Sequence, residues 1–135
     1  MIKLTIPGEP CAKQRPRTTK QGHTYTPQKT VNYETLVREL YILQNFRQQL
    51  EGELVMTVRA YFTIPKSASK KKAADMAGGR IRPDKRPDWD NVGKVISDAL
   101  NGLAYRDDSQ IGSATVEKWY SLEPRVEVIL MESEG

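Results

Sequence analysis

The chain has one cysteine and one histidine, and this scarcity excludes several kinds of site. Cys11 alone cannot form an intrachain disulfide, and Cys11 with His23 cannot make up a Cys/His zinc site. The sequence also lacks an uncharged apolar run near the ~20 residues that a membrane-spanning helix needs. We therefore expect a soluble protein without thiolate or zinc-finger chemistry.

The first ten residues, MIKLTIPGEP, lack the basic region, apolar block and small-residue cleavage site of a secretion signal. We expect a cytoplasmic protein that has neither a membrane nor another protein as its partner. The 135 residues fit one domain, residues 1–135, because a single core becomes efficient near ~100–150 residues.

The net charge of +4 is unevenly distributed along the chain. Residues 1–29 carry six basic side chains and one acidic one, and residues 66–86 carry eight and two, whereas residues 87–135 carry four and ten. This pattern predicts a polyanion-binding surface around a site that needs carboxylates. The side chains expected to contact DNA are Lys13, Arg15, Arg17, Lys70, Lys71, Lys72 and Arg86.

Alternating apolar side chains predict strands. They occur over residues 2–6, 53–64, 113–121 and 124–131. We expect the last two strands to be joined by a tight turn at Leu122 to Pro124. Residues 9–26 are rich in basic residues and predict an exposed loop, with a short hairpin about Gln21 and Gly22.

Two segments have apolar residues at helical spacing. The first is expected to have Thr26 as its cap and Pro27 at its first helical position, and to end before Gly52. Its expected buried residues are Tyr33, Leu36, Val37, Leu40 and Leu43. The second helix is expected from near Asp90 to near Gly102. Its expected buried residues are Val92, Val95, Ile96, Ala99, Leu100 and Leu103.

Residues 68–76 fit a short basic helix as well as a loop. Together, these elements predict an α/β or α+β fold with a single mixed β-sheet of about four strands and two main helices packed on it.

The chemically informative segment begins PDWDN, with Asp88 and Asp90 two residues apart. If the chain enters the second helix in an extended conformation, both carboxylates leave the backbone on the same side. Asp90 also stands where a helix cap is expected. Lys94 follows one turn later, on a polar stripe with Asn91 and Asp98.

A second acidic pair, Asp107 and Asp108, follows this helix and can return to its N-terminal end if the residues between run back along the sheet. Carboxylates brought together repel one another, and a divalent cation is the simplest compensation. Oxygen ligands without histidine or cysteine favour Mg²⁺, and Mn²⁺ is possible. In a chain with basic segments, this combination favours a metal-dependent nuclease.

A plainer interpretation stays open at this point. Asp90 would only cap the helix, Asp107 and Asp108 would only form a turn, and Asp98 would pair with Lys94 or with a base from the N-terminal loop. The protein would then be a non-catalytic DNA-binding protein that uses its basic loops.

The string PDWDNVGKVISDALNG, followed by YRDDSQI, resembles the signature of RusA-type Holliday junction resolvases, a D-x-D-N-x-x-K-x-x-x-D-x-L pattern and a D-D-x-x-I turn. The loop IPGEPCAKQRPR is similar to the family's N-terminal G-x-P-x-x-K-x-R-P-R stretch. The order of elements is consistent with the family over nearly the whole chain. The resemblance implies a RusA-like fold and a small homodimeric, Mg²⁺-dependent endodeoxyribonuclease of prophage or bacterial recombination and repair, which nicks four-way DNA junctions symmetrically.

By match to the motif, the resemblance implies that Asp88, Asp90 and Asp108 are the metal-binding catalytic acids, with Asp107 as the alternative third acid. It implies that Lys94 is the essential lysine. We expect Asn91 and Asp98 to support these residues from the same helix. Some family members have aromatic residues just before the first acid, where this chain has Arg86-Pro87, and Trp89 stands between its acids.

Overall fold

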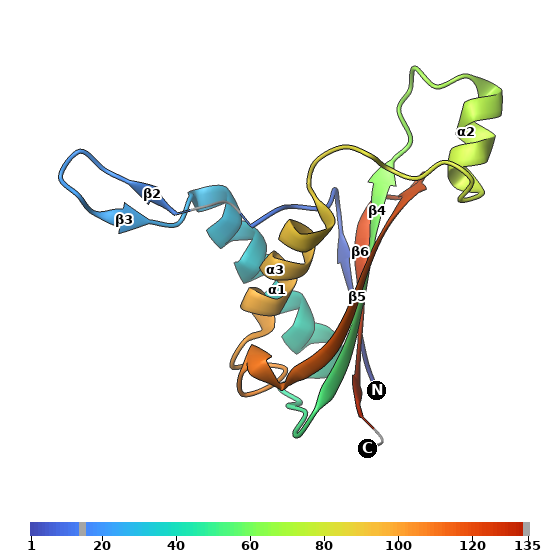
Figure 1. The fold of residues 1–135 in the computed structure, drawn as a ribbon. Helices are drawn as coiled ribbons and strands as arrows, with labels where there is room; N and C mark the ends of the chain where they lie inside the picture. Colours follow the sequence, from blue (N-terminus) through green and yellow to red (C-terminus); the bar gives the residue numbers. More distant parts are fainter. Residues whose placement is uncertain (14–15, 134–135) are drawn as a thin grey trace.

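A four-stranded mixed sheet with two helices on one face forms the centre of the fold (Figure 1). The computed structural model describes residues 1–13 and 16–133. The strands of the sheet are β1 (Ile2–Pro7), β4 (Leu54–Thr63), β5 (Ile111–Ser121) and β6 (Arg125–Glu132), in the order β1-β6-β4-β5. β4 is parallel to β5, and β6 is antiparallel to β1 and β4. The predicted mixed α+β sheet is confirmed.

The helices α1 (Gln28–Asn45) and α3 (Trp89–Leu100) contact each other and cover the same face of the sheet (Figure 1). The predicted buried face of α3 is confirmed, from Val92 to Leu100. It belongs to one core with the alternate side chains of β4 between Leu54 and Phe62. Full burial of such an aliphatic side chain contributes about 1.5–3 kcal/mol, so this packing holds the N-terminal end of α3 firmly over the sheet.

The prediction for α1 is wrong in two respects. The cap is Pro27 rather than Thr26, and no side chain caps this helix. Leu36 and Leu43 are exposed, because the buried face follows Thr30, Val37 and Tyr41. The helix ends at Asn45, well before Gly52, where Phe46 adopts a positive φ of 59°.

The last two strands are neighbours in sequence but not in the sheet. The short connection at Leu122 to Pro124 passes across the end of β4, so β6 inserts between β1 and β4. Sequence alternation located both strands but carried no information on their pairing.

Two small elements project from the sheet and its helices on opposite sides (Figure 1). One is the predicted hairpin, with β2 (Arg17–Thr18) and β3 (Thr24–Tyr25). The other is α2 (Lys70–Ala77), so the basic segment that fitted either a helix or a loop is a helix. Ser69 caps it, because Ser69 Oγ accepts a hydrogen bond from the Lys72 N–H. We call these the hairpin arm and the α2 arm. Within the described ranges, no helix is long and apolar enough to cross a membrane.

Candidate active site

The first acidic pair lies where the chain enters α3. Asp88 is the N-cap residue, with extended backbone and no side-chain capping bond, and Asp90 lies in the first helical turn. The expectation that Asp90 is the cap is therefore wrong by two residues. The two carboxylates nevertheless line one cavity of about 590 Å³, together with the basic residues Lys85, Arg86 and Lys118.

The two residues of the second acidic pair, Asp107 and Asp108, lie in different environments. Asp107 is the N-cap of the short 3-10 helix η1 (Asp108–Gln110), and its carboxylate accepts a hydrogen bond of 3.2 Å from the Ser109 N–H. The Ser109 side chain, and after it this backbone bond, lower the pKa of Asp107. The Asp108 N–H donates to Asn101 Oδ1 at 3.0 Å, and the Asp108 side chain faces a groove of about 330 Å³ that Asp90 and Lys94 also line. The groove therefore brings Asp108, rather than Asp107, to the same surface as Asp90.

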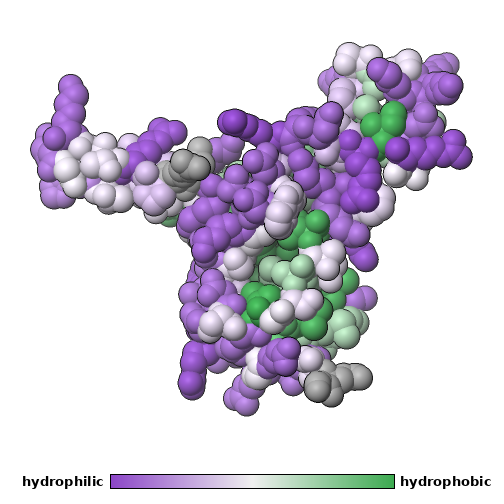
Figure 2. All heavy atoms as spheres, viewed as in Figure 1, coloured by the Kyte–Doolittle hydropathy of each residue, from purple (hydrophilic) through white to green (hydrophobic). Residues whose placement is uncertain are grey.

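The groove runs between α3 and β5, and its floor is apolar. Met56, Ile111 and Val116 line it. Figure 2 shows apolar surface on this side of the molecule, framed by hydrophilic side chains. Of the charged residues beside this floor, Asp90 and Lys94 are exposed and Asp108 is half-buried.

The segment that leads to η1 forms a compact buried turn and does not run back along the sheet as expected. Leu103, Ala104 and Tyr105 are all buried. The Tyr105 hydroxyl donates to the Ser97 carbonyl at 2.6 Å, and the Leu50 N–H donates to the Ala104 carbonyl at 2.8 Å. The first bond ties the turn to α3 and the second ties it to the segment before β4, and together they fix where Asp108 emerges.

Asp98 joins two lysines on the polar side of α3. Its carboxylate lies 3.2 Å from Lys94 Nζ and 3.3 Å from Lys13 Nζ, and Lys13 Nζ also lies 3.0 Å from Glu34 Oε1. Both partners that the sequence suggested for Asp98 are therefore present. Burial alone would lower the pKa of Lys13, but its bonds to Glu34 and Asp98 outweigh burial and raise that pKa.

Lys13 is thus held inside the fold, which differs from its predicted position at DNA. Only 23% of its side chain is exposed, and its backbone N–H donates to the Asn91 carbonyl at 3.2 Å. It fastens the N-terminal loop to α1 and α3. Arg17 and Lys70 to Lys72 are exposed on the two arms, whereas Arg15 lies outside the described residues.

Two cations that lie near the acids are not among the site residues predicted from the sequence. Lys118, on β5, lines the cavity of Asp88 and Asp90, and its ammonium donates to the Lys85 carbonyl. Lys29 lies in the first turn of α1 and lines a second cavity that contains Asp88. The helix dipole disfavours a cation at a helix N-terminus. This unfavourable position of Lys29 is the sequence feature that could have identified it as a functional residue.

The donor set suits a hard divalent cation, although it is not assembled as a three-residue cluster. Within residues 1–13 and 16–133, no group of three or more His, Cys, Asp or Glu side chains lies close enough to hold a metal. Over the same ranges, the carboxylates of Asp88, Asp90 and Asp108 have no hydrogen-bond or ion-pair partner. Mg²⁺ is commonly held by one or two carboxylates together with water and substrate phosphate, and the shared cavities provide carboxylates in pairs.

Comparison with known proteins gives two matches. Residues 7–131 match the sequence profile of the family described as Endodeoxyribonuclease RusA. The chain is also 40% identical over 136 residues to "Uncharacterized protein YqaN" of Bacillus subtilis (strain 168), which covers 97% of this chain and 96% of that protein. The profile runs from the end of β1 into β6 and includes both acidic pairs, and so the chain belongs to the RusA endodeoxyribonuclease family.

Proposed function

We propose that the protein is a Mg²⁺-dependent, structure-selective endodeoxyribonuclease that resolves four-way DNA junctions by paired symmetric nicks. It would act in DNA recombination and repair in the cytoplasm of a prophage-carrying bacterium. The observation that carries the proposal is the position of Asp88, Asp90 and Asp108, three family-motif acids without protein partners among the described residues, on a surface flanked by the two basic arms.

The acids and the arms have separate tasks in this proposal. Asp88, Asp90 and Asp108 would hold Mg²⁺, or Mn²⁺ in its place. When bound, the metal would polarise a phosphoryl oxygen and supply an activated water. The hairpin arm and the α2 arm would bind backbone phosphates on either side and hold the strand over the acids.

Lys94 supplies a positive charge beside the acids. It lines the same groove as Asp90 and Asp108, and its ion pair with Asp98 sets the direction of its side chain along α3. In the proposed reaction, its ammonium stabilises negative charge that develops on the phosphate in the transition state. Asn91 and Asp98 act as positioning residues, since the Asn91 carbonyl anchors the N-terminal loop and Asp98 anchors Lys94.

A homodimer is part of the same proposal. A four-way junction is approximately two-fold symmetric, and paired nicks are most simply made by two copies related by a two-fold axis. Sedimentation equilibrium would then give twice the mass of one chain, and a monomer that nicks both strands would contradict this assembly.

A second candidate, DNA binding without cleavage, is favoured by one observation: the described residues hold no ready-made three-residue metal cluster. Gel assays of the purified protein on four-way, three-way and linear duplex DNA, with and without Mg²⁺, separate the two functions. We expect nicks in the four-way junction only with Mg²⁺ and little cleavage of the linear duplex. Binding of all three DNAs without cleavage in either Mg²⁺ or Mn²⁺ would favour the second candidate.

A further inference from the structure

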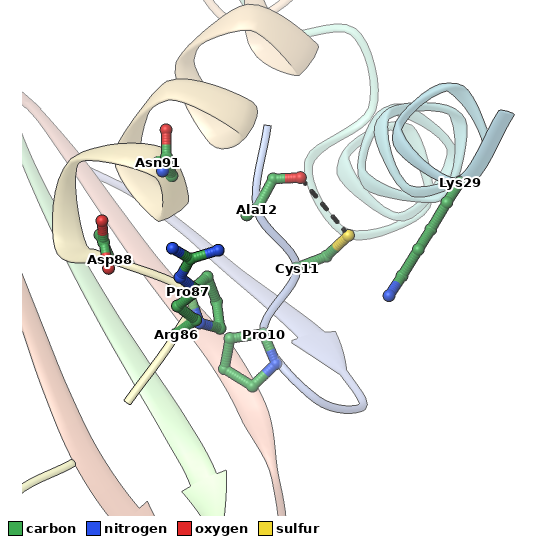
Figure 3. A pocket seen from close by; sticks show the side chains of 8 residues that line it. All are labelled: Pro10, Cys11, Ala12, Lys29, Arg86, Pro87, Asp88 and Asn91. Carbon is green, nitrogen blue, oxygen red and sulfur yellow. Dashed lines mark hydrogen bonds between the residues drawn. The ribbon is translucent and has the colours of Figure 1, made fainter. Parts of the chain in front are cut away.

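A cavity next to Asp88 lies outside the groove of the other acids. It has a volume of about 590 Å³, within the ~300–1,000 Å³ of small-molecule sites. Three segments meet there: the N-terminal loop at Pro10 to Ala12, the first turn of α1 at Lys29, and the entry into α3 at Arg86 to Asp88 (Figure 3). The Lys13–Asn91 backbone bond holds the loop against α3 and so keeps the cavity open beside the acid.

The lining of this cavity combines flat apolar groups with two unpaired cations. Ala12 and Pro87, both half-buried, present apolar surface, and Pro10, which is buried, also borders the cavity. Lys29 and Arg86 reach the cavity from either side of the loop, and within the described residues neither of them has an ion-pair partner. Lys13 and Lys94, by contrast, both form ion pairs with Asp98. Unpaired cations over apolar walls suit a ligand with both a phosphate and a flat ring.

Asp88 connects this cavity to the proposed reaction site. It lines both the cavity with Lys29 and the cavity with Asp90 and Lys118. A nucleotide bound beside Asp88 would therefore be next to the phosphate that is cleaved at the acids in the proposed reaction. In an intact duplex, a base is stacked and paired, and extracting it costs a few kcal/mol; a base at a branch point is already weakly stacked and costs less.

We propose that this cavity binds one unstacked nucleotide of the strand to be cut, with its base against Ala12 and Pro87 and with Lys29 and Arg86 as the cations that hold its phosphates. This rests on the proposed nuclease function and adds a source of selectivity to it. Branched DNA supplies such a nucleotide at low cost, whereas linear duplex does not. The cavity therefore favours the branch point before any chemistry takes place.

Cys11 is a natural reporter for this cavity, because it lines the wall and is the chain's only cysteine. The test measures how fast methyl methanethiosulfonate modifies Cys11 in the unaltered protein, in EDTA so that no DNA is cut. Each DNA is added at about ten times its own measured dissociation constant, which should slow modification about tenfold if the DNA fills the cavity. We expect four-way junction DNA to slow the reaction and blunt linear duplex to leave it unchanged.

A second measurement follows the base itself. A junction with 2-aminopurine at the branch nucleotides should become more fluorescent when the protein binds, because the base leaves its stack. Ala12→Phe, which fills the cavity, and Lys29→Ala, which removes one cation, should reduce this rise at equal occupancy. Lys3→Ala removes an exposed cation on β1, outside the cavity, and should leave the rise unchanged.

The outcomes separate the cavity from the proposed function. Equal protection of Cys11 by junction and by duplex would overturn the unstacked-nucleotide proposal, because the contact would then be with any DNA backbone. No protection by a bound junction that is nevertheless cut with Mg²⁺ would overturn the cavity proposal and leave the nuclease intact. Protection by the junction without cleavage in any divalent metal would contradict the nuclease and support the binding site alone.

Discussion

At the scale of single residues, the acids differ in whether their carboxylates form hydrogen bonds or ion pairs with other protein groups. The sequence could identify Asp88, Asp90 and the Asp107-Asp108 pair from spacing, but it could not choose within the pair. The choice depends on backbone geometry: Asp107 has extended backbone and caps η1, and Asp108 follows it into the groove. Neighbours one position apart can therefore have unrelated tasks.

Asp107 and Asp108 should respond differently to the same substitution. We expect Asp108→Asn to reduce junction cleavage by roughly 100-fold or more, because it removes charge where the phosphate is addressed. Asp107→Asn should keep cleavage within a few-fold and change stability by about 1 kcal/mol or less, since Asn also caps helices well. Single-turnover cleavage and thermal melting of both variants measure this, and full activity of Asp108→Asn would transfer the role to Asp107.

For Lys94, the expected loss concerns cleavage and not folding. Its side chain is 59% exposed, so Lys94→Ala should change stability by no more than about 0.5 kcal/mol. Cleavage should fall strongly, and Lys94→Arg should restore little of it, because a planar guanidinium does not replace a compact ammonium. Circular dichroism, melting and single-turnover rates make the comparison. An alanine variant with the normal rate would reduce Lys94 to a partner of Asp98.

At the scale of elements, the periodicity of apolar residues predicted which helices and strands form, but not which of them pair or pack together. The alternation of β4 and the apolar face of α3 were visible in sequence because each buries one face against the core. The insertion of β6 between β1 and β4 was not, since alternation is the same for any partner. The ion pairs of Lys13 could not be predicted from the sequence either, because Glu34 and Asp98 approach it only once α1 and α3 have packed.

Lys13 should stabilise the joint between the N-terminal loop and the two helices. Lys13→Ala leaves Glu34 and Asp98 side by side without this cation, and we expect a loss of about 1–2 kcal/mol in the free energy of unfolding. Lys20→Ala, on the hairpin turn, is the matched control and should stay within about 0.5 kcal/mol. Urea titrations measure both, and equal stability of the two variants would show that the ion pairs contribute nothing.

The pH dependence of the Lys13 effect has a defined sign. Its pKa in the folded state is raised above the ordinary 10.5, so its contribution is fully present below the unfolded pKa and is lost as pH rises through the folded value. The stability difference between wild type and Lys13→Ala should be constant between pH 7 and about pH 9, and should shrink only above about pH 10.5. A difference that disappears by about pH 8 would contradict this account.

The α2 arm should contribute to DNA affinity through charge alone. Replacing Lys70, Lys71 and Lys72 by glutamine keeps residues that favour helix while removing three positive charges. The slope of log affinity against log salt should become shallower by up to about three units, with a nearly unchanged rate for bound junction. Lys3→Gln on β1 is the control that should leave the slope unchanged. An unaltered slope in the triple variant would place α2 away from DNA.

At the scale of the whole molecule, the fold places acids between basic projections. The core supports α3, α3 and η1 present the acids, and the hairpin arm and α2 arm extend on opposite sides (Figure 1). The sequence indicated this division through its two basic segments and one acidic segment. It could not indicate the geometry, because composition does not fix the direction in which a segment leaves the fold.

The acids at α3 and η1 are proposed to carry out metal-dependent cleavage of DNA that the rest of the molecule holds. Single-turnover cleavage of a four-way junction by wild type and by Asp90→Asn, each titrated with Mg²⁺ and paired with junction binding in EDTA, tests it most directly. We predict that wild type cleaves in proportion to metal occupancy, while Asp90→Asn binds the junction with near-normal affinity and cleaves it roughly 100-fold more slowly or not at all. Cleavage by Asp90→Asn at the wild-type rate, or wild-type cleavage that persists unchanged in EDTA, would contradict the account.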